Sequence, residues 1–304
     1  MKASVAIATY NGAQYILEQL ESIVNQTRIV DEVIITDDCS TDNTAEIIKK
    51  FIFDNNLSES WHFYSNEQNL GFAGNFKRAI YKCTGDVIFL CDQDDIWVKD
   101  RIEKMMSVME ENNNIGVLAT KECKFRIDNE GNSQYEDIVE SLSLEEIKFT
   151  LRNRYLGAPG SAMCVKRNFV DKIATQWLPE MAHDDIIWEY SLLYKCLYWF
   201  DYISMYHRMH GNNVSGKHTH SKDKRIKYLS ALESRNKKLY KLSVDADCEK
   251  SQTRVYKNTY KMAEYRLQLI EKRRLFKIIP LICYLKYYYS KKSFLVEIAM
   301  ALKG

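Results

Sequence analysis

The chain is poor in the features that interrupt a folded domain. Its 304 residues include only 3 prolines, and the sequence contains no internal repeat and no low-complexity segment. Hydrophobic residues make up 46% of the chain and charged residues 28%. This is the balance of a globular protein, because disordered chains have too few apolar residues to form a core. We therefore expect one large core or two smaller ones.

Two further absences bear on the compartment. The eight cysteines contain no C-x-x-C pair, and several lie inside apolar runs, where a small buried thiol fits. The N-terminal stretch MKASVAIATYNG has one lysine and a short apolar run, without the length or the flanks of a signal peptide. We expect reduced cysteines and a cytoplasmic protein whose mature chain begins at Met1.

The sequence also lacks an uninterrupted run of about 20 apolar residues, so we expect no membrane-spanning helix. Its most apolar stretch, residues 278–302, is interrupted by Pro280, Lys286, Lys291 and Lys292. Such a stretch is typical of a helix that lies at a membrane surface, with lysines at its edges and aromatic rings at headgroup depth. Two alternatives are packing against the rest of the chain and an oligomer interface. Together they have the same weight as contact with a membrane.

Positive charge gathers at the C-terminal end. Residues 217–303 contain 22 Lys and Arg against 8 Asp and Glu, a balance of +14, so within a chain of net charge +2 residues 1–216 carry −12. Helical periodicity runs from Lys222 to about Arg274, which supports the same division. We predict a domain of residues 1–216 and a basic helical region of residues 217–304. A basic surface also suits nucleic acid, but no nucleic-acid-binding motif accompanies it, so we expect no such partner.

The first 120 residues alternate strand-like and helical patterns. Apolar runs rich in β-branched and aromatic residues occupy residues 4–10, 32–38, 62–66, 86–92 and 115–120. Helical patterns occupy residues 13–26, 42–55, 72–83 and 98–113. Such alternation predicts an α/β fold with a mainly parallel central sheet and helices on both faces.

Polar residues follow the predicted strands at the points where they end. In a parallel α/β sheet, ligands bind at the carboxyl ends of the strands. The polar stretches there are residues 10–12, 37–40, 65–68 and 92–95, and we expect them to converge on one edge of the sheet. Asp42 has a simpler explanation, because it precedes a predicted helix and can cap it.

The stretch FLCDQDDIW places Asp92, Asp94 and Asp95 within four positions after a buried strand. Carboxylates this close repel one another unless a cation or hydrogen-bond donors lie among them. Oxygen-rich sites of this kind suit Mg²⁺ or Mn²⁺, with substrate phosphates and water as further ligands. The alternative is that Asp94 and Asp95 cap a helix that begins near Val98, with Asp92 in solvent. Spacing alone does not separate the two hypotheses.

A second acidic stretch is MAHDDIIWEY, residues 181–190. His183, Asp184 and Asp185 precede an amphipathic helical run that we predict to extend through Trp199. Helix capping explains one acid, and the chain places two there.

A third polar stretch is MYHRMHGNNVSG, residues 205–216, which follows a strand-like segment at residues 198–206. It contains Arg208 and His210. A lone histidine is more often structural than a ligand, so His210 gains a functional role only if the acidic cluster lies nearby in space.

Five ordered motifs together resemble a known family. They are ATYNG (8–12), DEVIITDDCSTDNT (31–44), GDVIFLCDQDDIW (85–97), AHDDIIW (182–188) and YHRMHGNNVSG (206–216). In this order they are similar to family 2 glycosyltransferases of the GT-A fold, in the rhamnosyltransferase-like branch. The resemblance covers about residues 3–216 and implies a Rossmann-like nucleotide-sugar-binding domain, followed by the helical C-terminal region.

The resemblance implies a donor site at the strand ends. The donor-binding residues that it implies are Thr9, Tyr10, Asn11, Asp38, Asn75 and Asp92, with Asp37 beside them. Asp92 would lie near the ribose. Many relatives have an Arg-Asn pair where this chain has Gly74 and Asn75, so phosphate neutralisation would fall to Lys77, Arg78 or Arg208, or to the metal alone.

The resemblance also implies catalytic roles. Asp94 and His210 would contact a Mn²⁺ or Mg²⁺ ion that bridges the diphosphate, and Asp95 would order the loop. Asp184 would be the catalytic base, with Asp185 as a neighbour that could be mistaken for it. One base acting on one face implies a single displacement with inversion. Residues 157–161 would border the pocket or form an ordinary surface loop.

The expected function is a metal-dependent, inverting glycosyltransferase of bacterial surface polysaccharide biosynthesis at the cytoplasmic face of the membrane. Its donor would be a nucleoside-diphosphate sugar, with UDP or dTDP favoured, and its acceptor a glycan or a lipid-linked glycan. A homo-oligomer is left open. One rival, a nucleotidyltransferase, would need a Gly-rich phosphate loop that VAIATYNGAQ does not provide. The other is a sugar-nucleotide-binding or glycan-binding protein without catalysis.

Overall fold

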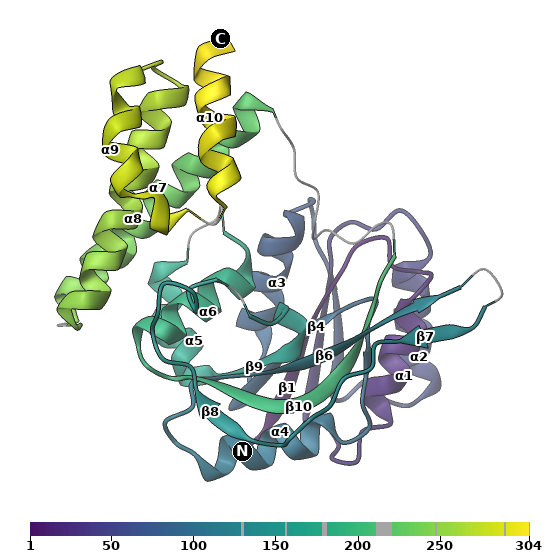
Figure 1. The fold of residues 1–304 in the computed structure, drawn as a ribbon. Coiled ribbons are helices and arrows are strands. Elements are labelled where there is room, and N and C mark those ends of the chain that lie inside the picture. The colour runs from purple at the N-terminus through teal and green to yellow at the C-terminus, as the bar shows by residue number, and fades with distance from the viewer. Residues whose placement is uncertain are drawn as a thin grey trace. The chain divides into compact units, whose positions relative to one another are not determined.

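The computed structural model describes residues 1–128, 131–155, 157–177, 181–210, 221–246, 248–288 and 290–303. These residues form two compact units (Figure 1). The first contains residues 1–148 and the described part of 153–213, and the second contains residues 149–152 and the described residues from 221 onward. The predicted boundary after residue 216 lies outside the described residues.

One mixed sheet forms the centre of the first unit. Within the described residues its strand order is β3 (Trp61–Ser65), β2 (Glu32–Asp37), β1 (Ala3–Thr9), β4 (Val87–Asp92), β9 (Met163–Lys166), β6 (Val117–Ile127), β10 (Leu197–Arg208) and β5 (Ile96–Trp97). Two short strands at its margin are β7 (Ser133–Tyr135) on β6 and β8 (Leu144–Glu146) on β10. Strands β3, β2, β1 and β4 are parallel, as are β6 and β10, while β9 joins these two parallel groups in antiparallel orientation. The predicted α/β fold with a mostly parallel sheet is confirmed.

Helices cover both faces of this sheet (Figure 1). They are α1 (Ile16–Val24), α2 (Thr44–Asp54), α3 (Gly71–Lys82), α4 (Arg101–Glu111), α5 (Arg167–Ile173) and α6 (His183–Leu193), with 3₁₀ turns at Gly160–Ala162 and Ala174–Gln176. The connections from β1 to β2 and from β2 to β3 are right-handed crossovers that run in the same direction along the sheet. They therefore place α1 and α2 on the same face of the sheet. The return from β3 to β4 places α3 on the other, where it contacts β1, β2 and α6.

Two predicted helix boundaries are wrong. Helix α6 ends at Leu193, and Leu197–Trp199 belong to β10, with Leu197 paired to Val117. The chain turns at Lys195, whose φ is +55°. The helix expected near Val98 begins at Arg101, because Ile96 and Trp97 form β5 against β10. Strand pairing across distant segments decided both boundaries, and periodicity within one segment cannot detect it.

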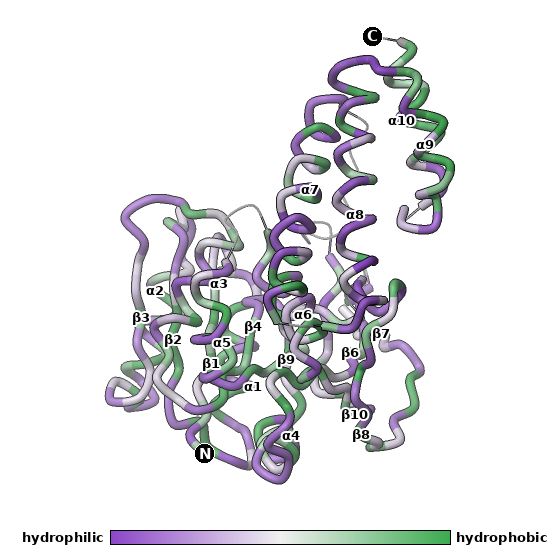
Figure 2. Tube along the Cα trace, turned by 90° about the vertical axis from the view of Figure 1, so that its left-hand side faces the viewer, coloured by the Kyte–Doolittle hydropathy of each residue, from purple (hydrophilic) through white to green (hydrophobic). Residues whose placement is uncertain are grey.

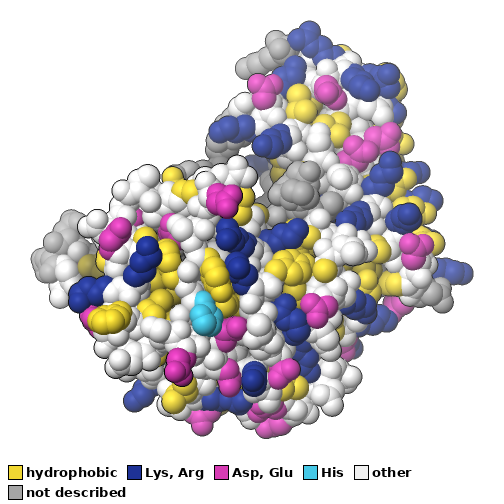
Figure 3. All heavy atoms as spheres, turned by 180° about the vertical axis from the view of Figure 1, so that it is seen from behind, with side chains coloured by type: hydrophobic (Ala, Val, Ile, Leu, Met, Phe, Trp, Pro, Cys, Tyr) yellow, Lys and Arg dark blue, Asp and Glu magenta, His cyan; other side chains and the backbone are white. Residues whose placement is uncertain are grey.

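The second unit consists of helices. They are α7 (Lys222–Asp245), α8 (Lys250–Ile270), α9 (Ile278–Cys283) and α10 (Lys291–Lys303), with 3₁₀ turns η3 (Leu275–Lys277) and η4 (Leu285–Tyr287). Figure 2 shows α9 largely in the hydrophobic colour, and Figure 3 shows Lys and Arg side chains spread over this unit. A buried ion pair, with Arg266 Nη2 at 2.6 Å from Glu297 Oε1, joins α8 to α10. No helix in the described part of the chain is long and apolar enough to cross a membrane.

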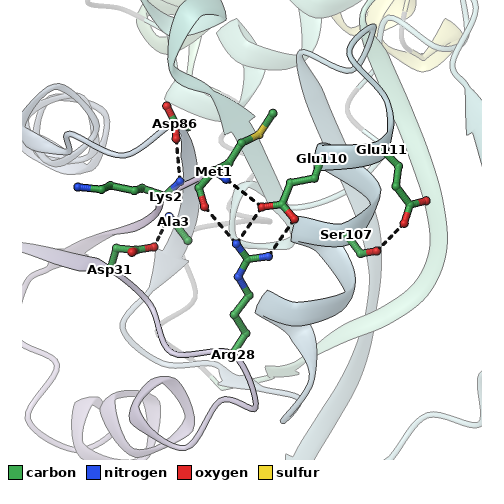
Figure 4. Close-up of polar contacts among 9 residues, drawn as sticks. All are labelled: Met1, Lys2, Ala3, Arg28, Asp31, Asp86, Ser107, Glu110 and Glu111. Carbon is green, nitrogen blue, oxygen red and sulfur yellow. Dashed lines mark hydrogen bonds and ion pairs between the residues drawn. The ribbon is translucent and has the colours of Figure 1, made fainter.

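Hydrogen bonds to carboxylates and a nearby ion pair surround the beginning of β1 (Figure 4). The Arg28 guanidinium donates to both carboxylate oxygens of Glu110, at 3.1 and 2.9 Å. The hydrogen bond from Arg28 lowers the pKa of Glu110 to about 2. Asp86 and Asp31 accept the backbone N–H groups of Lys2 and Ala3, each at 2.7 Å. These contacts fix the N-terminal end of the strand, and the polar residues singled out in the sequence lie at its other end.

Candidate active site

The carboxyl ends of β1, β2 and β4 bring the predicted residues together. Thr9 is paired with Asp37 across β1 and β2, and Ala8 is paired with Asp92 across β1 and β4. The parallel register therefore aligns three polar strand ends from segments far apart in the sequence. This is the convergence that the α/β pattern predicts.

Asp37 is buried and holds the loop after β2. Its oxygens accept hydrogen bonds from Thr9 Oγ1 at 2.8 Å and from the N–H and Oγ of Ser40 at 2.9 and 2.6 Å. These bonds satisfy the carboxylate within the protein. In this structure Asp37 positions the strand ends, and Thr9 is part of the same contact.

Asp38 belongs to a buried network. Its Oδ1 accepts from Asn66 Nδ2 and from the backbone N–H of Leu70, both at 2.7 Å. Asn66 Oδ1 in turn accepts from the Arg78 guanidinium at 2.6 Å.

The Asn75 amide donates to the carbonyls of Thr9 and Thr36 at 3.2 and 2.9 Å and accepts from Asn66 at 3.0 Å. Asn66 was not identified from the sequence as a site residue, although the strand-end stretch 65–68 contains it.

The loop after β1 is tied to the acidic loop by Gln93, which sequence analysis also missed. The Gln93 side-chain amide accepts from the backbone N–H of Tyr10 at 2.9 Å and donates to its carbonyl at 3.0 Å. A Cβ on Gly12 would lie 2.2 Å from Gln93 Oε1, so this contact needs the glycine. The Tyr10 side chain is left half exposed. Asn11, at φ +48°, accepts from the N–H of Thr41 at 2.8 Å.

The three acids of the cluster differ in burial. Asp92 and Asp94 are half-buried, whereas Asp95 is buried. Burial, and then the charges of Asp95 and Asp94, raise the pKa of Asp92 well above its usual range. Burial raises the pKa of Asp95 to about 7, against an opposing effect of His207. Negative charge is therefore costly here, and a cation bound at the cluster would relieve that cost.

The capping hypothesis for these acids is wrong. Helix α4 begins at Arg101 with Asp100 as its N-cap residue, and β5 separates it from the cluster. Asp95 Oδ1 accepts the backbone N–H of Arg208 at 3.3 Å, and its other oxygen is buried with no hydrogen-bond partner among the described residues. Asp95 thus joins the acidic loop to the end of β10.

His210 lies next to the acidic cluster. Its Nε2 is 2.8 Å from Asp94 Oδ2, and its ring stacks on Tyr15 with the centroids 4.7 Å apart. Arg208 donates from Nε to the Asp94 carbonyl at 3.1 Å and forms an ion pair with Glu18. Tyr15 and Glu18 were not identified from the sequence. The remainder of this motif, residues 211–216, lies outside the described residues.

The side-chain oxygen of Asp94 and the ring nitrogen of His210 fit a divalent metal ion as ligands. A carboxylate oxygen and an imidazole nitrogen converge at hydrogen-bond distance, and both are ligands for such ions. Within the described ranges, no group of three His, Cys, Asp or Glu residues could hold an ion by itself. Two protein ligands suffice where substrate phosphates and water complete the coordination.

Asp184 lies in the first turn of α6, followed by Asp185. Its charge contributes to the raised pKa of Asp92, so the two carboxylates lie within electrostatic range of each other. The neighbouring His183 is buried, stacks on Phe76 with the centroids 3.8 Å apart, and has its pKa lowered by burial. It therefore remains neutral at pH 7.

The loop at residues 157–161 borders Asp184. A Cβ on Gly160 would lie 3.0 Å from Asp184 Cβ and 2.7 Å from His183 Nε2. Gly160 and Ser161 are buried. Of the two interpretations of this loop, the structure supports the one in which it borders the site.

Lys77 and Arg101 are two cations near the strand ends, and each lies close to an aromatic ring. Lys77 Nζ lies 5.8 and 5.7 Å from the ring centroids of Tyr81 and Trp177. Arg101, which sequence analysis missed, is fully buried, stacks over Trp97 at 4.1 Å and donates to the Ser161 carbonyl. Burial lowers the pKa of Arg101 to about 10, which leaves it charged at neutral pH. Its positive charge interacts with Asp95 of the acidic cluster.

Solved structures share this fold. The chain aligns with Staphylococcus aureus TarS 1–349 in complex with UDP-GlcNAc at a TM-score of 0.65 and 19% identity, over 98% of this chain and 82% of that chain. It aligns with the mannosyltransferase PcManGT from Pyrobaculum calidifontis, in complex with GDP-Man and Mn²⁺, at a TM-score of 0.54 and 14% identity, over 99% and 84%. These neighbours show that the first unit has the GT-A-like fold.

Relatives by sequence are named as glycosyltransferases. MJ1057 of Methanocaldococcus jannaschii is 31% identical over 63% of this chain and 70% of its own length. TuaG of Bacillus subtilis is 34% identical over 36% of this chain, and the dTDP-rhamnosyl transferase RfbG of Shigella flexneri is 38% identical over 35%. The aligned stretches span 42% of TuaG and 38% of RfbG, less than half of each.

The sequence model of one family covers most of the first unit. It is described as "Glycosyl transferase family 2" and matches residues 4–174, more than half of the chain. The matched residues include the strand ends and the acidic cluster described above. The chain therefore belongs to glycosyl transferase family 2.

Proposed function

We propose that the protein is an inverting, metal-dependent glycosyltransferase that moves a sugar from a nucleoside-diphosphate donor to a glycan or lipid-linked acceptor in surface polysaccharide biosynthesis. The observation that carries the proposal is the convergence of Asp92, Asp94 and His210 at the sheet edge, with Asp184 acting on the same cluster. The catalytic part is residues 1–216, and residues 217–304 form an accessory basic region.

The donor lies along the ends of β1, β2 and β4. Asp92 contacts the ribose, and the half-exposed ring of Tyr10 offers a surface for the base. Asp38 and Asn75 act through the network that orders these strand ends. RfbG is named for dTDP-rhamnose, TarS was solved with UDP-GlcNAc and PcManGT with GDP-Man. These names support a nucleotide sugar, and UDP or dTDP remains our preferred class.

Asp94 and His210 are the residues that would hold the metal. When bound, Mn²⁺ or Mg²⁺ supplies positive charge that stabilises the departing diphosphate. The Mn²⁺ in the PcManGT complex supports this proposal. Asp95 and Arg208 keep the metal ligands in place, because the Asp95 carboxylate accepts from the Arg208 backbone and the Arg208 side chain donates to the Asp94 carbonyl.

Asp184 acts as the general base. It accepts the proton of the acceptor hydroxyl as that oxygen forms a bond to the anomeric carbon. The bond from the anomeric carbon to the diphosphate oxygen breaks on the opposite face, so the configuration inverts.

The biological setting rests on the relatives. The name of TuaG refers to teichuronic acid biosynthesis, and RfbG is named as a dTDP-rhamnosyl transferase. These names favour a polymer of the cell surface and an acceptor that carries the growing glycan.

A donor screen tests the proposal. Purified protein is mixed with UDP-, dTDP- and GDP-sugars together with Mn²⁺, Mg²⁺ or EDTA, and both thermal shift and donor hydrolysis are measured. We expect a response to one nucleotide class that needs the metal and is lost in Asp94→Ala. The exposed Asp54→Asn variant serves as the control. A response that EDTA leaves unchanged would contradict the metal role.

The non-catalytic alternative predicts a different pattern. A binding protein would show the thermal shift with its donor but no hydrolysis and no transfer to any added acceptor glycan. Hydrolysis that depends on Asp94 excludes it.

A further inference from the structure

The second unit has an exposed apolar surface on η3 and α9. Leu275, Phe276, Ile279 and Ile282 are between 43% and 73% exposed. Their spacing places them on one side of the segment, while Leu281 is fully buried in the core of the unit, which also contains Tyr287. Single exposed apolar residues are common, but four within eight positions form a patch.

Unpaired cations surround this patch. Lys272, Arg273 and Arg274 precede it, Lys277 lies within it and Lys286 follows it. Among the residues that the structure describes, none of these five forms an ion pair, whereas Arg266 and Arg225 inside the unit both contact Glu297. The Lys277 ammonium lies over the Tyr265 ring at 4.4 Å. Glu271 is the single acid between residues 271 and 286.

An exposed apolar patch surrounded by cations indicates an anionic lipid surface as the partner. Apolar side chains can enter the boundary between headgroups and acyl chains, while long basic side chains around them reach lipid phosphates. A second copy of the chain fits poorly, because a two-fold interface would bring two such basic rims together. Helix α9 has six residues and cannot span a bilayer.

We propose that residues 272–286, the docking surface, bind the chain to bilayers that contain anionic phospholipids. Leu275, Phe276, Ile279 and Ile282 insert at the interface, and Lys272, Arg273 and Arg274 contact lipid phosphates. The proposal does not depend on the sugar that the protein transfers or on its catalytic mechanism.

The test measures co-sedimentation of the full chain with two kinds of vesicle. One is pure phosphatidylcholine and the other contains phosphatidylglycerol. We expect binding to the anionic vesicles that weakens as salt is raised, with much weaker binding to the neutral ones. Two variants target the surface: Phe276→Ser/Ile279→Ser for the apolar patch and Arg273→Glu/Arg274→Glu for the rim. We expect each to weaken binding at least tenfold.

Matched controls are present in the same chain. Ile29→Ser/Phe53→Ser removes two exposed apolar side chains from the first unit. Arg254→Glu/Lys257→Glu removes two cations from α8. Both controls should bind within about threefold of the wild type. Circular dichroism and thermal melting verify that each variant is folded.

A direct readout uses Cys283, the exposed cysteine of the described residues. An environment-sensitive dye on Cys283 should shift to shorter wavelength with anionic vesicles. Absence of binding to either vesicle, or equal losses in the variants and their controls, would overturn the proposal. So would a Phe276→Ser/Ile279→Ser variant that converts an oligomer to a monomer in light scattering while vesicle binding is unchanged, because the surface would then be a subunit interface.

Discussion

The two units of the chain use charge in opposite ways. In the first unit, carboxylates at strand ends are held by hydrogen bonds from neighbouring loops, as for Asp37 and Asp38. In the second unit, cations such as Arg273 and Arg274 are exposed and without ion pairs among the described residues. Groups that carry out chemistry must be placed closely, which needs short hydrogen bonds. Cations that attract an oppositely charged surface need only the right sign of charge and a sufficient number.

The largest effect is expected from Asp184→Asn. The amide cannot accept a proton, so kcat should fall by about 10²–10⁴-fold, the usual contribution of a general base. The donor dissociation constant should stay near the wild-type value. Single-turnover kinetics and donor titration measure the two quantities separately.

Asp185→Asn is the matched control, because Asp185 is the next residue on the same helix. We expect a decrease of less than about tenfold, since it would not contact the reacting hydroxyl. A larger loss in Asp185→Asn than in Asp184→Asn would reverse the assignment of the base.

A buried ion pair tests whether the second unit also depends on placed charge. Glu297→Leu leaves the buried Arg266 guanidinium without its carboxylate. Breaking such a pair typically costs about 3–5 kcal/mol, so urea should unfold the second unit at a lower concentration. Arg266→Met/Glu297→Leu should recover much of this loss. A double variant no more stable than Glu297→Leu would contradict this explanation, because the unpaired guanidinium would then not be the cause of the loss.

A smaller effect is expected at the loop contact of the first unit. Gly12→Ala should displace the Gln93 side chain, whose Oε1 would lie 2.2 Å from the new Cβ, and so break its two bonds to Tyr10. Each lost bond is worth about 0.5–1.5 kcal/mol, so the donor Kd should rise several-fold. Gln93→Ala should give a similar rise, and the double variant should add little more. Additive losses would mean that the two changes act independently.

The smallest effect concerns pH. Because the folded pKa of Glu110 is lowered to about 2 from 4.5, the pair with Arg28 stabilises the fold above pH 4.5, and this contribution is lost as pH falls toward 2. The pair is about one-third exposed, which limits its worth to about 0.2–1 kcal/mol. Urea unfolding should show Glu110→Gln less stable than wild type at pH 6 and nearly equal at pH 2. A difference that persists at pH 2 would contradict the electrostatic explanation.

Local patterns in the sequence predicted most of the first sheet. The runs before Asp37 and Asp92 are strands within one or two residues of the predicted limits, because parallel strands buried on both faces are continuous apolar runs. The helix predicted through Trp199 was wrong, because pairing of Leu197 with Val117 depends on a strand 80 residues away. The capping hypothesis for Asp94 failed for the same reason, since β5 is paired with the distant strand β10.

The sequence by itself determined the alternation of strands and helices, the order of the polar motifs and the separation of acidic and basic parts of the chain. Each follows from side-chain chemistry over a few neighbouring positions. Tertiary structure alone decided that His210 meets Asp94 and that Asn66 and Gln93 order the strand ends. It also decided that Arg101 is buried and that the apolar face of α9 is exposed. These depend on contacts between distant segments, which no local pattern records.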